Sequence, residues 1–101
     1  MYINVYFMPH PPIILKEIGK EDSKLARCTI EGMTLLAKKV AKIKPETIIF
    51  VTPHGNSFSN GTCLLGDQEL SGDFGNFGHD EIKFHKRVNM DLTKKIFDCF
   101  E

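Results

Sequence analysis

The sequence predicts an α/β fold, a βαβ unit with a mostly parallel sheet and flanking helices. Two apolar runs, residues 3–8 and 47–52, are rich in β-branched and aromatic side chains and lack polar alternation, which is typical of strands buried on both faces. Between them, apolar side chains recur at helical spacing over residues 22–44. Strand, helix and strand in this order form a βαβ unit, whose strands are parallel and whose crossover is right-handed.

The first apolar run leads into a stiff loop. Pro9, Pro11 and Pro12 lack a backbone N–H and disfavour helical dihedral angles in the residues that precede them. The strand is therefore expected to end at residue 8, with His10 held inside a fixed loop.

The helix between the strands has recognisable ends. Asp22 or Ser23 is expected to cap its N-terminus, and Pro45 stops it after Lys44. Gly32, in its middle, costs about 1 kcal/mol relative to alanine, so we expect it to mark a close approach of the helix to the sheet.

The second half of the chain has weaker secondary-structure signals than the first. Residues 62–65 are predicted to form a third strand after a turn at Asn60 and Gly61, residues 66–78 a glycine-rich loop, and residues 82–84 a short strand. Asn89 is predicted to cap a final amphipathic helix. That helix has no C-cap glycine before the chain stops at Glu101, which is the pattern of a truncated domain.

Composition excludes several classes of function. The 101 residues allow at most one domain, and 13 basic and 13 acidic side chains cancel, so no overall field attracts nucleic acid or an anionic membrane. No segment approaches the roughly 20 apolar residues of a membrane span. Cys28, Cys63 and Cys99 are an odd number and far apart, which argues against a disulfide framework or a zinc knuckle and favours buried, reduced thiols in a cytoplasmic protein.

A Pro-His pair follows each predicted strand, at His10 and at His54. Ligand sites of α/β sheets lie beyond the carboxyl ends of parallel strands, so both imidazoles are expected at one edge of the sheet. Strands about 4.8 Å apart allow two imidazoles to share one ion at roughly 2.0 to 2.1 Å. Neutral imidazole suits Fe(II), zinc or copper. The alternative is that each histidine is a separate surface or capping residue.

Four segments carry a resemblance to a known family. Residues 7–14 (FMPHPPII) and 48–55 (IIFVTPHG) resemble the LigB-like class III extradiol ring-cleavage dioxygenases. Residues 72–78 (GDFGNFG), and Phe84 followed by residues 89–92 (NMDL), are similar to the dioxygenase-like part of the Memo-related AmmeMemoRadiSam system proteins. The resemblance spans nearly the whole chain and implies the N-terminal part of a LigB-like dioxygenase fold, so residues 1–101 are expected to be a single, truncated LigB-like domain.

The resemblance implies a chemistry for the histidines. In the family, each Pro-His string supplies one ligand of a non-haem Fe(II), so His10 and His54 inherit that role. The open positions then bind a catecholic aromatic diol and O2, while a later glutamate completes the ligand set and a later histidine acts as acid and base. Both later segments are absent here, so the chain is expected to be an oxidoreductase at family level and inactive as an isolated fragment.

A second hypothesis is a noncatalytic, Memo-like module of an AmmeMemoRadiSam system that binds a metal or a partner. It predicts self-association or instability, because the apolar face that a missing half would cover stays exposed. The expected partner is a further copy in a homo-oligomer or a missing C-terminal half. His79 and His85 are given no role by the resemblance and are expected to be exposed near a charged turn. Phe74 and Phe77 could equally stack on an aromatic substrate or pin the glycine loop.

Overall fold

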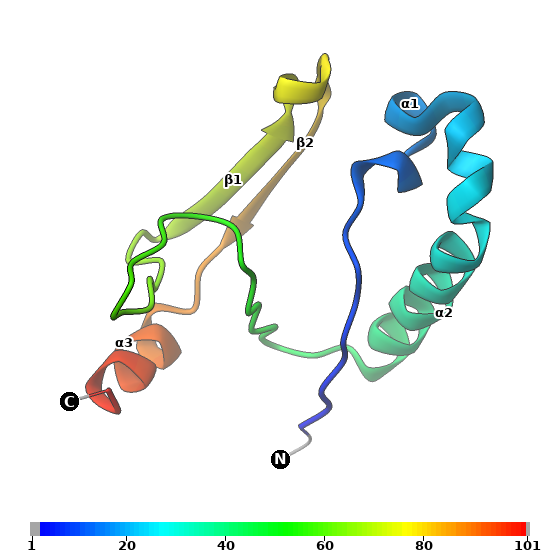
Figure 1. Cartoon of the computed structure of the whole chain (residues 1–101). Helices are drawn as coiled ribbons and strands as arrows, with labels where there is room; N and C mark the ends of the chain where they lie inside the picture. Colours follow the sequence, from blue (N-terminus) through cyan, green and yellow to red (C-terminus); the bar gives the residue numbers. More distant parts are fainter. Residues whose placement is uncertain (1–2, 101) are drawn as a thin grey trace.

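The computed structural model describes residues 3–100, which fold as a mixture of helices and a two-stranded sheet (Figure 1). The predicted α/β class is therefore confirmed. Its helices, strands and short 3₁₀ turns are, in chain order, η1 (Pro12–Ile14), α1 (Lys16–Gly19), η2 (Lys20–Ala26), α2 (Arg27–Ile43), β1 (Glu69–Phe74), η3 (Gly75–Phe77), β2 (His79–Arg87) and α3 (Met90–Asp98).

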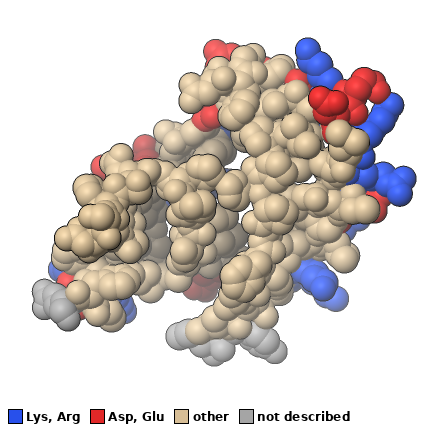
Figure 2. Space-filling model, in the orientation of Figure 1, with Lys and Arg blue, Asp and Glu red and all other residues tan. Residues whose placement is uncertain are grey.

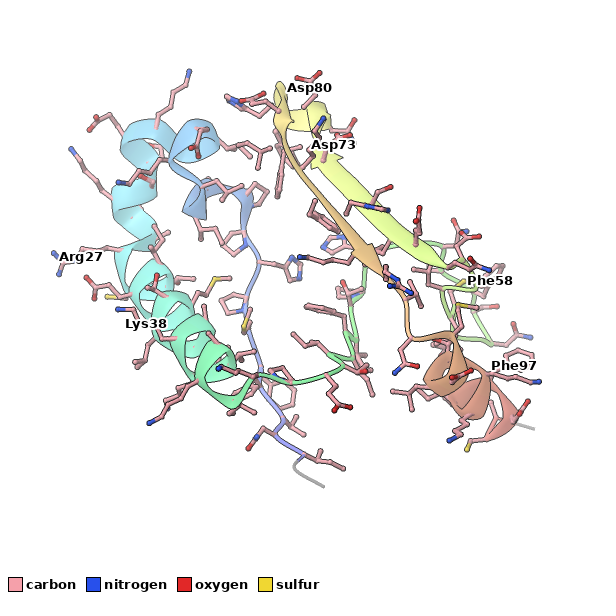
Figure 3. The ribbon with its side chains drawn as sticks, turned by 180° about the vertical axis from the view of Figure 1, so that it is seen from behind. Arg27, Lys38, Phe58, Asp73, Asp80 and Phe97 are labelled. Atoms are coloured by element: carbon pink, nitrogen blue, oxygen red, sulfur yellow. The ribbon has the colours of Figure 1, made fainter. Side chains whose placement is uncertain are left out.

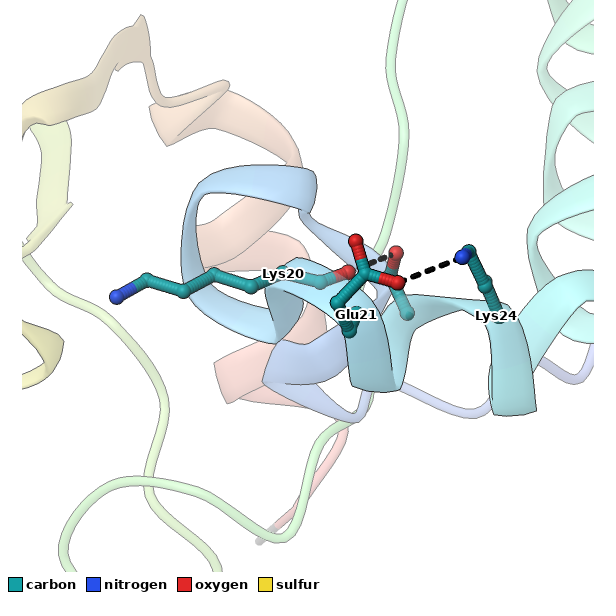
Figure 4. A network of polar contacts seen from close by, with 4 residues as sticks. Lys20, Glu21 and Lys24 are labelled. Carbon is teal, nitrogen blue, oxygen red and sulfur yellow. Dashed lines mark hydrogen bonds and ion pairs between the residues drawn. The ribbon is translucent and has the colours of Figure 1, made fainter.

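The long helix α2 begins later than the sequence predicts. Residues 20–26 wind as the tighter 3₁₀ helix η2, and α2 starts only at Arg27. The Ser23 hydroxyl donates back to the Lys20 carbonyl oxygen at 2.6 Å, so it does not cap a following helix. An exposed ion pair between Lys24 and Glu21, 2.6 Å apart, covers the same turn (Figure 4). Such exposed pairs contribute little to stability.

Helix α2 ends where it was predicted to end. Lys44 takes the left-handed conformation, with φ of 53°, and its N–H donates to the Val40 carbonyl oxygen at 3.1 Å before Pro45 stops the helix. Of the apolar positions on the predicted helix face, three are half-buried at helical spacing, Met33, Leu36 and Val40, whereas Leu25, Cys28 and Ile43 are exposed. The close approach expected at Gly32 is wrong, because a Cβ built there meets no atom within 4 Å.

The three predicted apolar strands do not form as strands. Residues 3–8, 47–52 and 62–65 run without ladder hydrogen bonds, and near the third run only an isolated bridge joins Phe58 to Gly61, across the predicted turn. A strand of this composition is stable when both of its faces are covered. In the described chain, helix α2 lies along one side of residues 3–11 (Figure 1). The parallel pairing thus stays a prediction.

The hydrogen-bonded sheet of the described residues is the antiparallel hairpin of β1 and β2, with Glu69 opposite Arg87. The strand predicted at residues 82–84 is confirmed as part of the longer β2, whereas the loop predicted at residues 66–78 is wrong over β1. Strand β1 alternates exposed and half-buried residues, and Gly72 leaves room for the Phe84 ring, which would lie 3.0 Å from a Cβ at that position. An aromatic ring over a glycine is a recognised way to stabilise a glycine-containing strand pair.

Helix α3 begins at the predicted cap. The Asn89 side-chain oxygen accepts a hydrogen bond from the Leu92 N–H at 3.0 Å. Its side-chain nitrogen donates to the Thr47 hydroxyl oxygen at 2.8 Å, 42 residues earlier in the chain. Asn89 therefore joins α3 to the segment that leads to His54.

This double use of Asn89 gives a testable coupling. Asn89→Ser keeps an N-cap hydroxyl but removes the donor to Thr47, and Thr47→Val removes the acceptor. Each change is expected to lower the free energy of unfolding by about 0.5–1 kcal/mol, and the double variant should cost little more than one single change. Urea unfolding of the four proteins measures this cycle. Fully additive losses would show that the two side chains do not interact.

The described residues have almost no interior. Ala26 is their one buried apolar side chain, and an open hollow of about 420 Å³ separates residues 5–9 from α2. Cys28, Cys63 and Cys99 are free and exposed, so the prediction that they are buried is wrong. None of the helices formed by residues 3–100 is long and apolar enough to cross a membrane.

Candidate metal centre

The loop that carries His10 is held by the turn that follows it. Pro11 is extended, with φ of −69° and ψ of 134°, and its carbonyl oxygen accepts a hydrogen bond from the Ile14 N–H at 3.2 Å. The carbonyl oxygen of Pro12 accepts from Leu15 at 3.1 Å. Because proline fixes its own φ, the chain enters this turn with little freedom. The predicted stiff loop after residue 8 is therefore observed, although no strand precedes it.

The loop that carries His54 is shaped by its two neighbours. The His54 backbone N–H donates to the Thr52 hydroxyl oxygen at 3.2 Å, which is the short-range bond of a serine or threonine turn. Gly55 has φ of 113°, a conformation that only glycine adopts without strain, and a Cβ there would meet no atom within 4 Å. Gly55 therefore allows a sharp turn directly after His54. The contribution of Thr52 was missed, although a Thr-Pro-His string is a sequence signal for it.

The two imidazoles meet. His10 Nδ1 lies 3.2 Å from His54 Nε2, although 44 positions separate the residues. Their ring centroids are 4.6 Å apart and the ring planes are inclined by 76°. Both side chains are exposed. The structure thus brings together the two residues that the sequence singled out, and it points one nitrogen of each ring at the other.

This spacing fits a shared metal ion. Two nitrogens 3.2 Å apart, each about 2.1 Å from an ion, subtend roughly 100° there, between the octahedral and tetrahedral values. The same spacing also fits a hydrogen bond in which one neutral ring donates and the other accepts. Both arrangements use the same two nitrogens, and a metal would replace the hydrogen bond once the donor ring carries its proton on its other nitrogen.

The other titratable groups lie elsewhere. Among residues 3–100, no group of three or more His, Cys, Asp or Glu side chains is placed to hold a metal ion. Asp73 and Asp80 lie at the tip of the hairpin (Figure 3), where the Asp73 carboxylate accepts a hydrogen bond from the Gly75 N–H at 2.8 Å. The described residues therefore bring two candidate ligands together at this point and no third His, Cys, Asp or Glu.

His79 and His85 pair with glutamates of the hairpin. His79 Nδ1 lies 2.7 Å from Glu81 Oε1, and His85 Nε2 lies 3.1 Å from Glu69 Oε2. The hydrogen bond with His79 and then a backbone hydrogen bond hold the pKa of the Glu81 carboxyl below its ordinary value. His85 is exposed as predicted, whereas His79 is half-buried. Both pairs join residues within the hairpin, and neither includes His10 or His54.

Phe74, the last residue of β1, and Phe77, the last residue of η3, lie close together. Their ring centroids are 6.2 Å apart and their planes are inclined by 48°, a geometry within the range of favourable aromatic pairs. Gly78, with φ of 80°, then reverses the chain into β2. The two rings thus pack on each other at the hairpin tip.

Comparison with known proteins identifies the family. Residues 4–101 match the family described as the catalytic LigB subunit of aromatic ring-opening dioxygenase. The chain belongs to the LigB family. It is also 37% identical over 93 residues, 92% of its length, to Protein CA_C1420 of Clostridium acetobutylicum. No solved structure matches it.

Membership of the LigB family supports a metal-dependent chemistry for the family as a whole and does not assign a role to either histidine. LigB dioxygenases open aromatic rings and typically use a metal, and both Pro-His strings of this chain lie inside the matched residues. The chain spans about a fifth of the length of its Clostridium relative. The resemblance to Memo-related proteins stays a prediction, as does the ligand role of His10 and His54.

Proposed function

We propose that His10 and His54 are two ligands of a non-haem Fe(II) in a LigB-type extradiol dioxygenase site, which opens catecholic aromatic rings with O2. The observation that carries this proposal is the 3.2 Å approach of His10 Nδ1 and His54 Nε2. It supports the proposal because these nitrogens come from distant segments and lie at a spacing that suits one ion.

The residues around the pair have defined tasks in this proposal. Neutral imidazole is the form that binds Fe(II), so each ring must present a lone pair and hold its remaining proton on the far nitrogen. Proline on both sides of His10 and the turn at Gly55 limit how far the rings can separate. Fe(II), when bound, would pass electron density from a catecholic diol to O2. The carboxylate ligand and the acid–base residue would come from polypeptide outside these 101 residues.

A noncatalytic role is the second candidate. It is favoured by the same lack of a third ligand among the described residues, because two imidazoles leave most coordination positions to water. In this case the chain binds a metal, iron or else zinc or copper, or a protein partner, without turnover. Both candidates share the histidine pair and differ in the reaction.

Anaerobic Fe(II) titration of the 101-residue chain tests the proposed site. We expect saturable binding of one Fe(II) per chain, with Zn(II) and Cu(II) competing for it. The same assay with catechol and air, on longer polypeptide that includes the proposed carboxylate ligand and acid–base residue, separates the candidates, because oxygen uptake above that of free Fe(II) supports a dioxygenase and its absence supports the noncatalytic module. Fe(II) binding that never saturates would contradict the site itself.

We propose a reducing, cytoplasmic setting for this chemistry. Three free and exposed thiols support it, because exposed thiols persist where glutathione and thioredoxin keep them reduced. A reducing compartment also favours Fe(II) over Fe(III).

A further inference from the structure

The two Pro-His loops restrain their histidines differently. His10 has a proline on each side, so the backbone is restricted both before and after it. His54 follows Pro53 but precedes Gly55, and a glycine restricts neither its own backbone nor that of its neighbour. The proline and glycine of the second loop therefore leave the backbone at His54 freer than the backbone at His10.

The hydroxyl of Thr52 supplies the restraint that the second loop lacks. Its oxygen accepts the hydrogen bond from the His54 N–H at 3.2 Å, across Pro53. Because proline has no N–H, the His54 N–H is the first backbone donor that follows Thr52. Pro53 fixes its own φ, and the hydrogen bond restricts its ψ and with it the direction of His54. The corresponding position of the first loop is Met8, which has no hydroxyl.

Few other interactions act on this loop in the described chain. Residues 47–52 make no ladder hydrogen bonds, and the link from Thr47 to Asn89 lies at the far end of this run. The ion pairs of the described residues lie in η2, at the start of α2 and within the hairpin. Charged side chains gather over η2 and α2, while the part of the surface between α2 and the hairpin carries few of them (Figure 2). Among residues 3–100, the Thr52 hydroxyl is the hydrogen-bond partner of the His54 backbone.

We propose that Thr52 is a positioning residue of the histidine pair. By accepting the His54 N–H, its hydroxyl holds His54 Nε2 at 3.2 Å from His10 Nδ1. The ring nitrogen lies at the far end of its side chain, so a small change in the ψ of Pro53 displaces it further than the tolerance of a metal–nitrogen bond, about 0.2 Å. Without the bond to Thr52, the His54 ring is expected to sample directions away from His10.

The consequence of this positioning rests on the proposed Fe(II) site and is a higher affinity for the ion. A pair of rings that is in place before the ion arrives has less freedom to lose on binding, so less of the binding free energy is used to order it. The contact between the two rings, by contrast, is measurable without metal. Failure of the metal site and failure of the positioning role are therefore distinguishable.

Thr52→Val and Thr52→Ser test the proposal in the metal-free chain. Valine has nearly the shape of threonine but cannot accept the hydrogen bond, whereas serine keeps the acceptor. With ring centroids 4.6 Å apart, His10 and His54 should show a nuclear Overhauser effect between their ring protons in the wild type and in Thr52→Ser. Thr52→Val should lose it, and its His54 amide should exchange with solvent about three to ten times faster, the effect of one lost hydrogen bond.

Anaerobic Fe(II) titration then measures the consequence for the metal. Thr52→Val should bind Fe(II) about three to ten times more weakly than the wild type, and Thr52→Ser should bind like the wild type. No ion pair holds this loop in the described chain, so the loss should be the same at low and high salt. Thr52 is exposed, and Thr52→Ala repeats the loss of the acceptor with a smaller side chain in case Thr52→Val fails to fold.

Thr34→Val is the matched control. The Thr34 hydroxyl donates to the Ile30 carbonyl oxygen at 2.8 Å within α2, so this change also removes a local threonine hydrogen bond, away from the histidines. It should leave the ring contact and the Fe(II) affinity unchanged. Far-UV circular dichroism shows whether each variant keeps its helices.

Three results would overturn the positioning role: a wild-type chain whose rings make no contact, a Thr52→Val chain that keeps the contact and the slow amide exchange, or a Thr52→Ser chain that behaves like Thr52→Val. A wild-type chain whose rings meet but which never saturates with Fe(II) would contradict the metal site instead. In that case the ring contact alone decides the role of Thr52.

Discussion

Replacing Gly19 with alanine is expected to lower the free energy of unfolding by about 3 kcal/mol, and the melting temperature by more than about 10 °C. Gly19 is buried at the end of α1, where an added Cβ would overlap the carbonyl oxygen of Ile13 and lie 2.9 Å from its carbonyl carbon. These are backbone atoms, so no side-chain rotation relieves the overlap. The turn η1, which follows His10, would have to move.

Gly32→Ala is the matched control for this prediction. Gly19 and Gly32 both have helical backbone, so each substitution brings the same intrinsic gain from alanine, about 1 kcal/mol. Gly32 has open space around it, and its substitution should therefore raise stability. Urea unfolding of the two variants measures whether the overlap with Ile13 at position 19 outweighs the gain in helix propensity that alanine brings at both positions. Equal effects at both positions would mean that α1 does not pack on Ile13 as described.

Removal of either site histidine is expected to abolish saturable Fe(II) binding. His10→Ala and His54→Ala should each weaken the affinity by about 100-fold or more, since loss of a supporting hydrogen bond to a ligand alone costs 10- to 100-fold. The double variant should be no weaker than either single variant, because one imidazole cannot hold the ion against water. Anaerobic titration and the imidazole proton resonances measure both effects.

His79→Ala and His85→Ala are the controls for general histidine binding. Both residues are bound to glutamates of the hairpin and should leave the Fe(II) affinity unchanged. If these variants bind as weakly as His10→Ala, the metal is distributed over the histidines of the surface. If all four single variants bind as the wild type does, the proposed centre is wrong.

The helices show what local sequence can predict. The cap at Asn89 and the stop at Lys44 depend on residues within one turn, and both were predicted. The start of α2 was not, because the hydroxyl of Ser23 bonds backward to Lys20, and composition does not distinguish that bond from a cap. Strand β1 was missed because its residues are mainly polar. The available sign of a strand was the placement of its apolar side chains, Leu70 and Phe74, on one face of a two-residue alternation; both are half-buried in the structure.

The apolar runs and the histidines show where sequence reasoning stops. Residues 3–8 and 47–52 have strand composition, but a parallel ladder is non-local and needs cover on both faces, which the described residues do not provide. The meeting of His10 and His54 was predicted from two parallel strand ends at one sheet edge. In the structure the rings meet without that ladder, and the proline and glycine beside them shape the two loops. No sequence pattern predicts the hydrogen bond between Asn89 and Thr47.

The separation of the two histidines along the chain has a consequence for the unfolded state. They are 44 positions apart and enclose the whole of α2. Any bond that holds both imidazoles at one point closes that loop and removes the extended conformations in which its ends are far apart. By chain-entropy arithmetic such a closure is worth about 4 kcal/mol, comparable to a native disulfide. For a chain with so few buried side chains, a bound ion would then act as a reversible cross-link. The melting temperature would rise with the fraction of chains that hold the ion.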